Sequence, residues 1–185
     1  MDLGLKGRTA LVMGASQGLG EATATLLAKE GAHVVLVARR EDALKQMQQR
    51  IVDAGGSAEI AVCDLFDRNS RRSLCDLIQT LPRIDVLIAN SGGPAPGMAP
   101  GIESDVWVRE FDAMVVGLIE IIDTAVARMK SAEFGRILVI GSSGMVVPIP
   151  KLAVSNTLRS AIGGYVKTLA EQVASVGVTC NMVLP

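Results

Sequence analysis

The sequence of 185 residues is poor in the side chains on which several kinds of site depend. It contains one histidine, His33, and three widely spaced cysteines, Cys63, Cys75 and Cys180, without a C-x-x-C pair. A single histidine at the start of a predicted strand excludes a histidine-rich metal site and a Ser-His-Asp triad, so we expect no bound metal. An odd number of cysteines without a signal peptide is typical of the reducing cytoplasm, where we expect the protein.

The chain also has no large excess of positive or negative charge, and its aromatic rings are few. The 18 lysine and arginine residues are balanced by 19 aspartate and glutamate residues, and aromatic residues make up only 3% of the chain. A formal net charge of −1 provides no basic field for nucleic acid, and so few rings leave little to stack on bases. No apolar run approaches the ~20 residues needed to cross a bilayer. The composition therefore argues against nucleic acid and membrane as partners.

Apolar residues are abundant, at 49% of the chain, and they fall in short runs that alternate with helical patterns. The length corresponds to roughly one domain. The strand candidates are continuously apolar, which is typical of a parallel sheet covered by helices on both faces. This predicts a doubly wound α/β domain of the Rossmann type, with a parallel sheet of about six strands. The predicted strands are 8–13, 33–38, 58–63, 84–89, 136–140 and 178–184, and the predicted helices are 19–30, 41–54, 69–80, 105–130 and 152–175.

A glycine-rich segment joins the first predicted strand directly to the first predicted helix. Gly14, Gly18 and Gly20 follow the spacing G-x-x-x-G-x-G. Gly14 can turn sharply, Gly18 lets the backbone approach a diphosphate, and Gly20 permits close packing of helix and strand, while the helix N-terminus attracts the anion. No Gly-Lys-Ser/Thr follows, which excludes a P-loop for ATP or GTP. A glycine-rich turn without a ligand has the same spacing, but the strand–helix context favours a dinucleotide cradle made of Gly14, Ser16, Gln17, Gly18, Leu19 and Gly20.

Two arginines, Arg39 and Arg40, follow the second predicted strand. A site that selects the unphosphorylated ribose of NAD needs an aspartate or glutamate there, to hold the 2′-hydroxyl group. An arginine pairs instead with a 2′-phosphate through charge-assisted hydrogen bonds. Glu41 and Asp42 come next, and we assign them to the first turn of the following helix. We therefore expect NADP rather than NAD as the cofactor, although a solvated pair of arginines is the alternative.

These segments resemble the classical short-chain dehydrogenases/reductases over nearly the whole chain. The likeness continues in residues 63–65 and 89–92, which follow the third and fourth predicted strands, and in 135–143 and 181–185. The segment Asn90-Ser91-Gly92-Gly93-Pro94 departs from the family's usual Asn-Asn-Ala-Gly but keeps glycine where the backbone approaches the cofactor. The resemblance implies that Asp64 holds the adenine amino group. Beyond the glycine segment, the cofactor contacts that it implies are Asp64, Leu65, Asn90, Ser91, Gly92, Arg159 and Pro185.

The catalytic pattern of the family is incomplete in this chain. The family uses a serine, a tyrosine, a lysine four residues after the tyrosine, and an asparagine on the preceding helix. Family spacing places these four positions at Ser142, Ser155, Arg159 and Met114, so only the serine is kept. The single tyrosine, Tyr165, lies about 15 Å along a helix from Ser155 and therefore cannot take its place.

Two functions fit this altered pattern. The first is an NADP-dependent oxidoreductase that transfers hydride between NADP(H) and a small carbonyl or alcohol substrate, with Ser142, Ser155 and Arg159 as its catalytic set. Arg159 stays protonated and cannot relay a proton, but a guanidinium can hold ribose hydroxyl groups and stabilise an oxyanion. Such an enzyme lacks general acid catalysis, which is worth typically 10²–10⁴-fold. The alternative is a non-catalytic NADP-binding protein, either a sensor or an assembly partner; a truncated product without a role of its own also fits.

The two long predicted helices, 105–130 and 152–175, carry apolar residues on more than one face, as at Val115, Val116, Leu118, Ile119, Ile121 and Ile122. An excess of this kind predicts a second buried face. In the resembling family these helices pair between subunits, so we expect a homo-oligomer. The chain stops at Pro185, where the family continues with a glycine, a substrate-covering loop and a seventh strand. We therefore expect residues 1–185 to form a single NAD(P)-binding Rossmann domain without that C-terminal segment.

Overall fold

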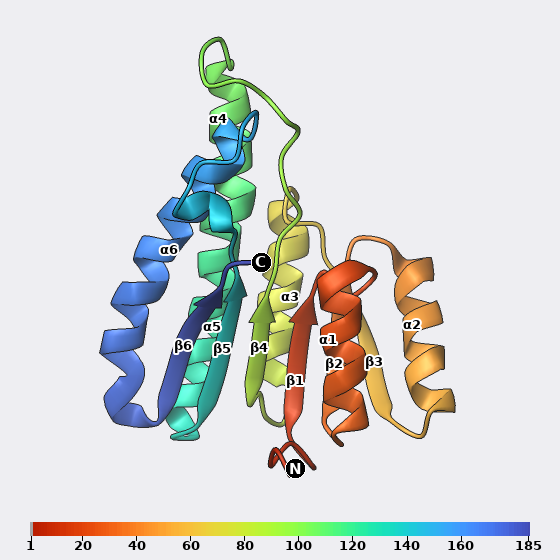
Figure 1. Cartoon of the computed structure of the whole chain (residues 1–185). Coiled ribbons are helices and arrows are strands. Elements are labelled where there is room, and N and C mark those ends of the chain that lie inside the picture. The colour runs from red at the N-terminus through yellow and green to blue at the C-terminus, as the bar shows by residue number, and fades with distance from the viewer. Residues whose placement is uncertain (1) are drawn as a thin grey trace.

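The computed structural model describes residues 2–185, and its six strands form one parallel sheet (Figure 1). The order is β3-β2-β1-β4-β5-β6, and every neighbouring pair is parallel. The strands are β1 (Thr9–Met13), β2 (His33–Ala38), β3 (Ser57–Val62), β4 (Val86–Ala89), β5 (Gly135–Ile140) and β6 (Val178–Val183). The chain changes direction across the sheet between β1 and β4, which is where open α/β sheets bind ligands. The predicted doubly wound sheet is confirmed.

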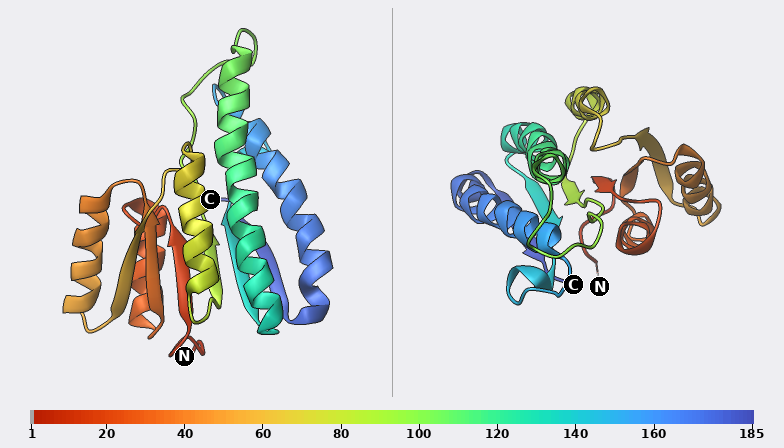
Figure 2. Two further views of the ribbon diagram at one scale, coloured as in Figure 1. Left: turned by 180° about the vertical axis from the view of Figure 1, so that it is seen from behind. Right: turned by 90° about the horizontal axis from the view of Figure 1, so that it is seen from above.

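Helices cover the sheet on both faces, as the view from above in Figure 2 shows. Helices α3, α5 and α6 pack on one face, and α1 and α2 pack on the other, over β1 and its neighbours. Every residue of β1 and β4 is buried, because these central strands are covered on both sides. None of the helices in residues 2–185 combines the length and the apolar composition of a membrane span. The helices are α1 (Gly18–Lys29), α2 (Glu41–Asp53), α3 (Arg68–Thr80), α4 (Ser104–Phe111), α5 (Gly117–Ser131) and α6 (Ala153–Val173).

The helix predicted over 105–130 contains an irregularity that its sequence pattern does not show. Between α4 and α5 lies a π-helical turn, η1 (Asp112–Val116), so the three form one continuous rod with an extra residue in the middle. Such turns occur frequently at functional sites. Met114, which stands at the family's asparagine position, lies in this turn. The other predicted elements agree with the structure to within two residues at each end.

Candidate functional site

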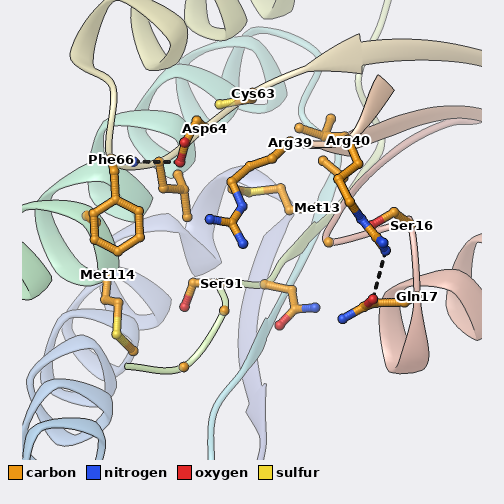
Figure 3. Close-up of a pocket in the computed structure, with 18 of the residues that line it drawn as sticks. Met13, Ser16, Gln17, Arg39, Arg40, Cys63, Asp64, Phe66, Ser91 and Met114 are labelled. Atoms are coloured by element: carbon orange, nitrogen blue, oxygen red, sulfur yellow. Dashed lines mark hydrogen bonds between the residues drawn. The ribbon is translucent and has the colours of Figure 1, made fainter. Parts of the chain in front are cut away.

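A pocket of about 400 Å³ opens at the carboxyl edge of the sheet, over the switch point between β1 and β4 (Figure 3). It is lined by the segments that follow β1, β2, β3 and β4, and by one face of α4 and η1. The structure therefore brings four separate sequence motifs to one cavity. The predicted cofactor residues that line it are Gly14, Ser16, Gln17, Gly18, Arg39, Arg40, Asp64, Leu65, Asn90, Ser91 and Gly92.

The glycine segment takes the conformation for which glycine is needed. Gly14 and Gly18 have φ angles of 67° and 60°, in the left-handed region. Gly20 lies beneath the loop, where an added Cβ atom would come within 2.2 Å of the Gly14 carbonyl oxygen. The N-cap residue of α1, Gln17, makes no side-chain capping bond, so the first N–H groups of the helix are not consumed by a side chain. The segment thus presents free N–H donors and partial positive charge to the pocket.

Two arginines stand at the β2 end of the pocket. The Arg40 Nη2 atom donates a 2.8 Å hydrogen bond to the Gln17 Oε1 atom across the pocket rim. The Arg39 side chain extends over the cavity, and its guanidinium makes no ion pair with any residue of 2–185 (Figure 3). Glu41 lies in the first turn of α2 and pairs with Lys45 at 2.8 Å, outside the pocket. This end of the pocket is therefore cationic.

The loop after β3 is held in place by a buried cation. The Arg71 Nη1 atom donates to the Leu65 carbonyl oxygen at 2.7 Å and to the Asp112 carboxylate at 2.9 Å. Its Nε atom donates to the Glu120 carboxylate, also at 2.9 Å. Hydrogen bonds from Arg71 and Arg68 lower the pKa of Asp112, so this carboxylate stays charged. The network ties the Asp64–Leu65 wall of the pocket to the π turn η1.

A second buried cation holds the loop after β4. Arg159, on α6, is only 7% exposed. Its Nη1 atom donates to the Ile140 carbonyl at 2.8 Å, and its Nη2 atom donates to the carbonyls of Ser91 at 3.1 Å and Gly92 at 3.4 Å. Burial lowers the pKa of Arg159 from its ordinary value, and no carboxylate contributes to that shift. The guanidinium therefore joins the ends of β4 and β5 through backbone carbonyls alone.

Residues 8–185 match the family model described as short chain dehydrogenase. The chain belongs to the short-chain dehydrogenase family. It is 29% identical to YvaG of Bacillus subtilis (strain 168), described as an uncharacterized oxidoreductase, over 100% of this chain and 70% of that protein. The resemblance seen in the sequence is thereby confirmed.

Solved structures show the same short-chain dehydrogenase fold. The L-sorbose reductase from Gluconobacter frateurii, solved in complex with NADPH and L-sorbose, is 26% identical and superposes with a TM-score of 0.94. That match covers 100% of this chain and 71% of the reductase. A 3-oxoacyl (acyl-carrier-protein) reductase from Agrobacterium tumefaciens C58, solved with NADP bound, is 26% identical with a TM-score of 0.93, over 98% of this chain and 70% of that one.

The residues predicted for catalysis in this short-chain dehydrogenase, Ser142, Ser155 and Arg159, lie outside the pocket lining, whereas Met114, at the asparagine position, is part of it. Ser142 caps the short helix η2 (Ser143–Met145), and its Oγ atom accepts a 3.1 Å hydrogen bond from the Gly144 N–H. Ser155 is half-buried in the first turn of α6. The Tyr165 hydroxyl donates to the Asp123 carboxylate, and burial together with that contact raises the pKa of the phenol. Tyrosine is thus committed elsewhere, as its distance along the helix predicts.

Four predicted cofactor residues also lie outside the pocket lining: Leu19, Gly20, Arg159 and Pro185. Leu19 points outward and is 53% exposed, whereas Gly20 and Arg159 act on the pocket through the backbone they support. The Pro185 carbonyl accepts 3.3 Å hydrogen bonds from the N–H and the Oγ of Ser143. Direct cofactor contact stays a prediction for these four residues, as it does for those that line the pocket.

One charged residue of the pocket lining, Glu110, belongs to no sequence motif and was not predicted. Glu110 lines the cavity from α4, is 5% exposed, and receives a 2.9 Å bond from the exposed Arg109. Ala113 and Met114 line the pocket from the same helical face. The signal was available, because a glutamate three and four residues before two buried apolar residues lies on the inward face of a helix. Without a motif at that position, the spacing alone named no ligand.

Proposed function

We propose that this short-chain dehydrogenase is an oxidoreductase that uses NADP(H) to interconvert a small carbonyl compound and the corresponding alcohol. The observation that carries the proposal is one pocket with a glycine cradle at its centre and two arginines at its β2 end. When bound, the cofactor supplies or accepts the hydride. The residues of the chain bind it, orient it and hold the substrate oxygen.

The residues of the pocket fit a dinucleotide. A Cβ atom added at Gly18, Gly92 or Gly93 would meet no heavy atom within 4 Å, and all three glycines line the pocket. Side chains there would fill the groove, so glycine keeps it open. The uncapped start of α1 supplies N–H donors for a diphosphate. NADP- and NADPH-bound relatives of the same fold support the same assignment.

The preference for NADP rests on Arg39 and Arg40, which follow β2, whereas the acidic residues that line the pocket, Asp64 and Glu110, come from the loop after β3 and from α4. We expect NADPH to bind at least about tenfold more tightly than NADH, since charge-assisted bonds to the 2′-phosphate are among the stronger hydrogen bonds. The measurement is a titration of each nucleotide by calorimetry or by Trp107 fluorescence.

Arg39→Asp tests this preference directly. The substitution should lower the affinity for NADPH about tenfold or more, because it places a carboxylate opposite the 2′-phosphate. The affinity for NADH should be nearly unchanged. Arg72→Asp, at an exposed position on α3, makes the same change of charge away from the pocket and serves as the control. If the Arg39→Asp variant bound NADPH as tightly as the wild type does, the proposed phosphate contact would be refuted.

For catalysis we propose that Ser142 holds the substrate oxygen, with Arg159 and Ser155 completing the set. The Ser142 oxygen accepts the Gly144 N–H, which leaves its own proton free to donate. Arg159 brings a permanent positive charge to the ends of β4 and β5 but no transferable proton. Ser155 is a far weaker acid than tyrosine. We therefore expect slow turnover, with the proton supplied by water.

The test of catalysis is NADPH oxidation across a panel of ketones, aldehydes and sugars. Ser142→Ala should lower kcat about tenfold or more, because a hydrogen bond to the reacting oxygen is lost. Ser131→Ala is the control, since the Ser131 hydroxyl is exposed and bonds only to the Ala127 carbonyl. NADPH binding without turnover on any substrate would favour the second candidate, a non-catalytic NADP-binding protein. The replacements at Ser155, Arg159 and Met114 are the observations that keep this candidate open.

We also propose that residues 1–185 act as one NAD(P)-binding Rossmann domain, that the protein works in the cytoplasm, and that it forms homo-oligomers. Four of the six apolar residues named from the sequence, Val115, Leu118, Ile121 and Ile122, are buried within the chain. The exposed apolar face is instead centred on Val108 and Phe111 of α4, with the half-buried Trp107 and Val116 beside them. Val108 is 68% exposed there, so Val108→Glu should shift the protein towards monomer in analytical ultracentrifugation.

A further inference from the structure

A buried carboxylate in the pocket wall has one oxygen atom without a partner. Glu110, on α4, lines the pocket and is only 5% exposed. Its Oε1 atom accepts a 2.9 Å hydrogen bond from Arg109, and no residue of 2–185 donates to its Oε2 atom. The Oε2 atom is not sealed off, because the Ser91 Oγ atom is the only side-chain nitrogen or oxygen in those residues that is both buried and unpaired. A ligand that donates a hydrogen bond therefore fits Glu110.

The neighbours of Glu110 show at which end of the pocket it lies. Met114 follows Glu110 by about one helical turn, and both residues line the pocket. Figure 3 shows Met114 and Asp64 at one end of the pocket and Arg40 at the other, with Arg39 between them. The hydrogen bonds of the buried Arg71 tie the loop after β3 to the helical rod at this point. The pocket is thus cationic at its β2 end and acidic where the loop after β3 meets α4.

The acidic end suits the base of a dinucleotide. In the proposed NADP site the two arginines bind the 2′-phosphate of the adenosine ribose, and the base is attached to that ribose. The exocyclic amino group of adenine only donates hydrogen bonds, and it carries two hydrogens. Ionised carboxylates only accept, and Asp64 and Glu110 supply one acceptor for each hydrogen. The anionic phosphates are repelled from this end and attracted to the glycine segment and the arginines.

We propose that Glu110 recognises the base of the dinucleotide, with its unpaired carboxylate oxygen accepting a hydrogen bond from the exocyclic amino group of adenine. The proposal rests on the proposed NADP function and adds a specificity-determining residue to it. Glu110 selects a base that has an amino group at this position over one that has a carbonyl oxygen, since two facing acceptors repel. A carboxamide at position 110 loses this selectivity, because it can turn its NH2 group towards the carbonyl oxygen.

The experiment compares NADPH with deamino-NADPH, in which hypoxanthine replaces adenine and a carbonyl oxygen replaces the amino group. The wild type should bind NADPH about thirtyfold more tightly, because the analogue loses charge-assisted bonds and leaves acceptors unpaired. Glu110→Gln should bind deamino-NADPH about tenfold more tightly than the wild type does, and NADPH about threefold less tightly. Calorimetry gives the dissociation constants, and thermal unfolding checks that the variant is folded.

The matched control is Glu103→Gln. Glu103 immediately precedes α4, is exposed, makes no side-chain capping bond and does not line the pocket. This variant loses the same charge beside the same helix, so it should leave both dissociation constants unchanged. The two variants therefore differ in where the carboxamide lies and not in the change of charge.

The outcomes separate this proposal from the one on which it rests. If the wild type binds neither dinucleotide, the NADP site itself is wrong and the contact with Glu110 fails with it. If the wild type binds both equally well, the NADP site stands and recognition of the amino group is refuted without any variant. If the wild type discriminates and Glu110→Gln discriminates as strongly, Asp64 alone accounts for the selectivity and the role of Glu110 is refuted. Equal weakening of both ligands in Glu110→Gln would also refute it, because that loss is structural.

Discussion

The two halves of the carboxyl edge differ in how closely they follow the family. On the β1, β2 and β3 side, the glycine segment, Arg39 and Asp64 line one pocket. On the β5 and β6 side, Ser142 and Ser155 lie apart from that pocket, and the lysine position holds an arginine bonded to backbone carbonyls. The half that contains the glycine segment, which we propose as the nucleotide half, keeps the family's pattern, whereas the half that contains Ser142 and Ser155, the proposed chemical half, has altered side chains.

The same contrast appears in what supports each half. The nucleotide half rests on an ionic network, in which Arg71 bonds to Asp112, Glu120 and the Leu65 carbonyl. The chemical half rests on Arg159, a cation without a carboxylate partner. An ionic network responds to pH and a guanidinium held by carbonyls does not, so the two supports can be told apart by experiment.

The largest effect is expected at Gly20, beneath the nucleotide half. Gly20→Ala places a Cβ atom 2.2 Å from the Gly14 carbonyl, and the contact is with backbone, which cannot move aside cheaply. We expect about 3 kcal/mol of destabilisation and about a hundredfold loss of NADPH affinity, because the cradle must open. Urea unfolding and nucleotide titration measure the two. Normal NADPH binding by the Gly20→Ala variant would show that the cradle is not the binding element.

Arg159→Met should be next in size, at about 2 kcal/mol of destabilisation. The variant removes the donor from three carbonyls, two of which, those of Ile140 and Ser91, are in buried hydrogen bonds. The loss outweighs the relief from removing a buried charge. Nucleotide affinity should fall as well, because the Ser91–Gly92 wall is released. Lys167→Met, at an exposed position on the same helix, should be close to neutral. The measurement is urea unfolding of the two variants. Equal free energies of unfolding would mean that the Arg159 hydrogen bonds make no net contribution to stability.

Asp112→Asn should cost about 1 kcal/mol at neutral pH, and the cost should disappear in acid. The pKa of Asp112 is lowered below its ordinary value of 3.8, chiefly by the hydrogen bond from Arg71. Its stabilising contribution is therefore complete above that value and is lost as the pH falls through the lower pKa of the folded state. Urea unfolding of both proteins at pH 7 and about pH 3 tests the sign. A difference that stays constant with pH would exclude a role for this charge.

Among the four test substitutions Gly20→Ala, Arg159→Met, Asp112→Asn and Gly164→Ala, the last should produce the smallest change and the only gain. Gly164 lies within α6, and a Cβ atom there would meet nothing within 4 Å. Alanine should therefore stabilise the protein by about 0.5–1 kcal/mol, because it loses less conformational entropy in a helix. The same substitution thus has opposite signs at Gly20 and Gly164. A loss of stability at Gly164 would reveal a contact on that face, for example with a second copy of the chain.

The features that could be predicted from the sequence depend on local patterns, whereas most of those that could not depend on contacts between residues far apart in the chain. The glycine spacing and Arg39 are read within a few residues of a strand end, so their place in the pocket could be predicted. The bonds from Arg159 to Ser91 and from Arg71 to Glu120 join residues 68 and 49 positions apart, which no local pattern contains. The π turn at Asp112–Val116 was not predicted because the apolar periodicity of a long helix tolerates one extra residue. Glu110 was not predicted because it belongs to no motif, although the helical spacing places it on the inward face.

The π turn also determines how far α4 is rotated about the helix axis relative to α5. Successive residues of an α-helix are rotated by about 100° around its axis. Deleting one residue from 112–116 would let the turn close as ordinary α-helix and would rotate α4 by about that angle relative to α5. Glu110 would then swing away from the pocket, and Trp107 and Phe111 would leave the exposed apolar face. The one extra residue of the π turn thus determines the orientation of both the pocket wall at Glu110 and the exposed apolar face of α4.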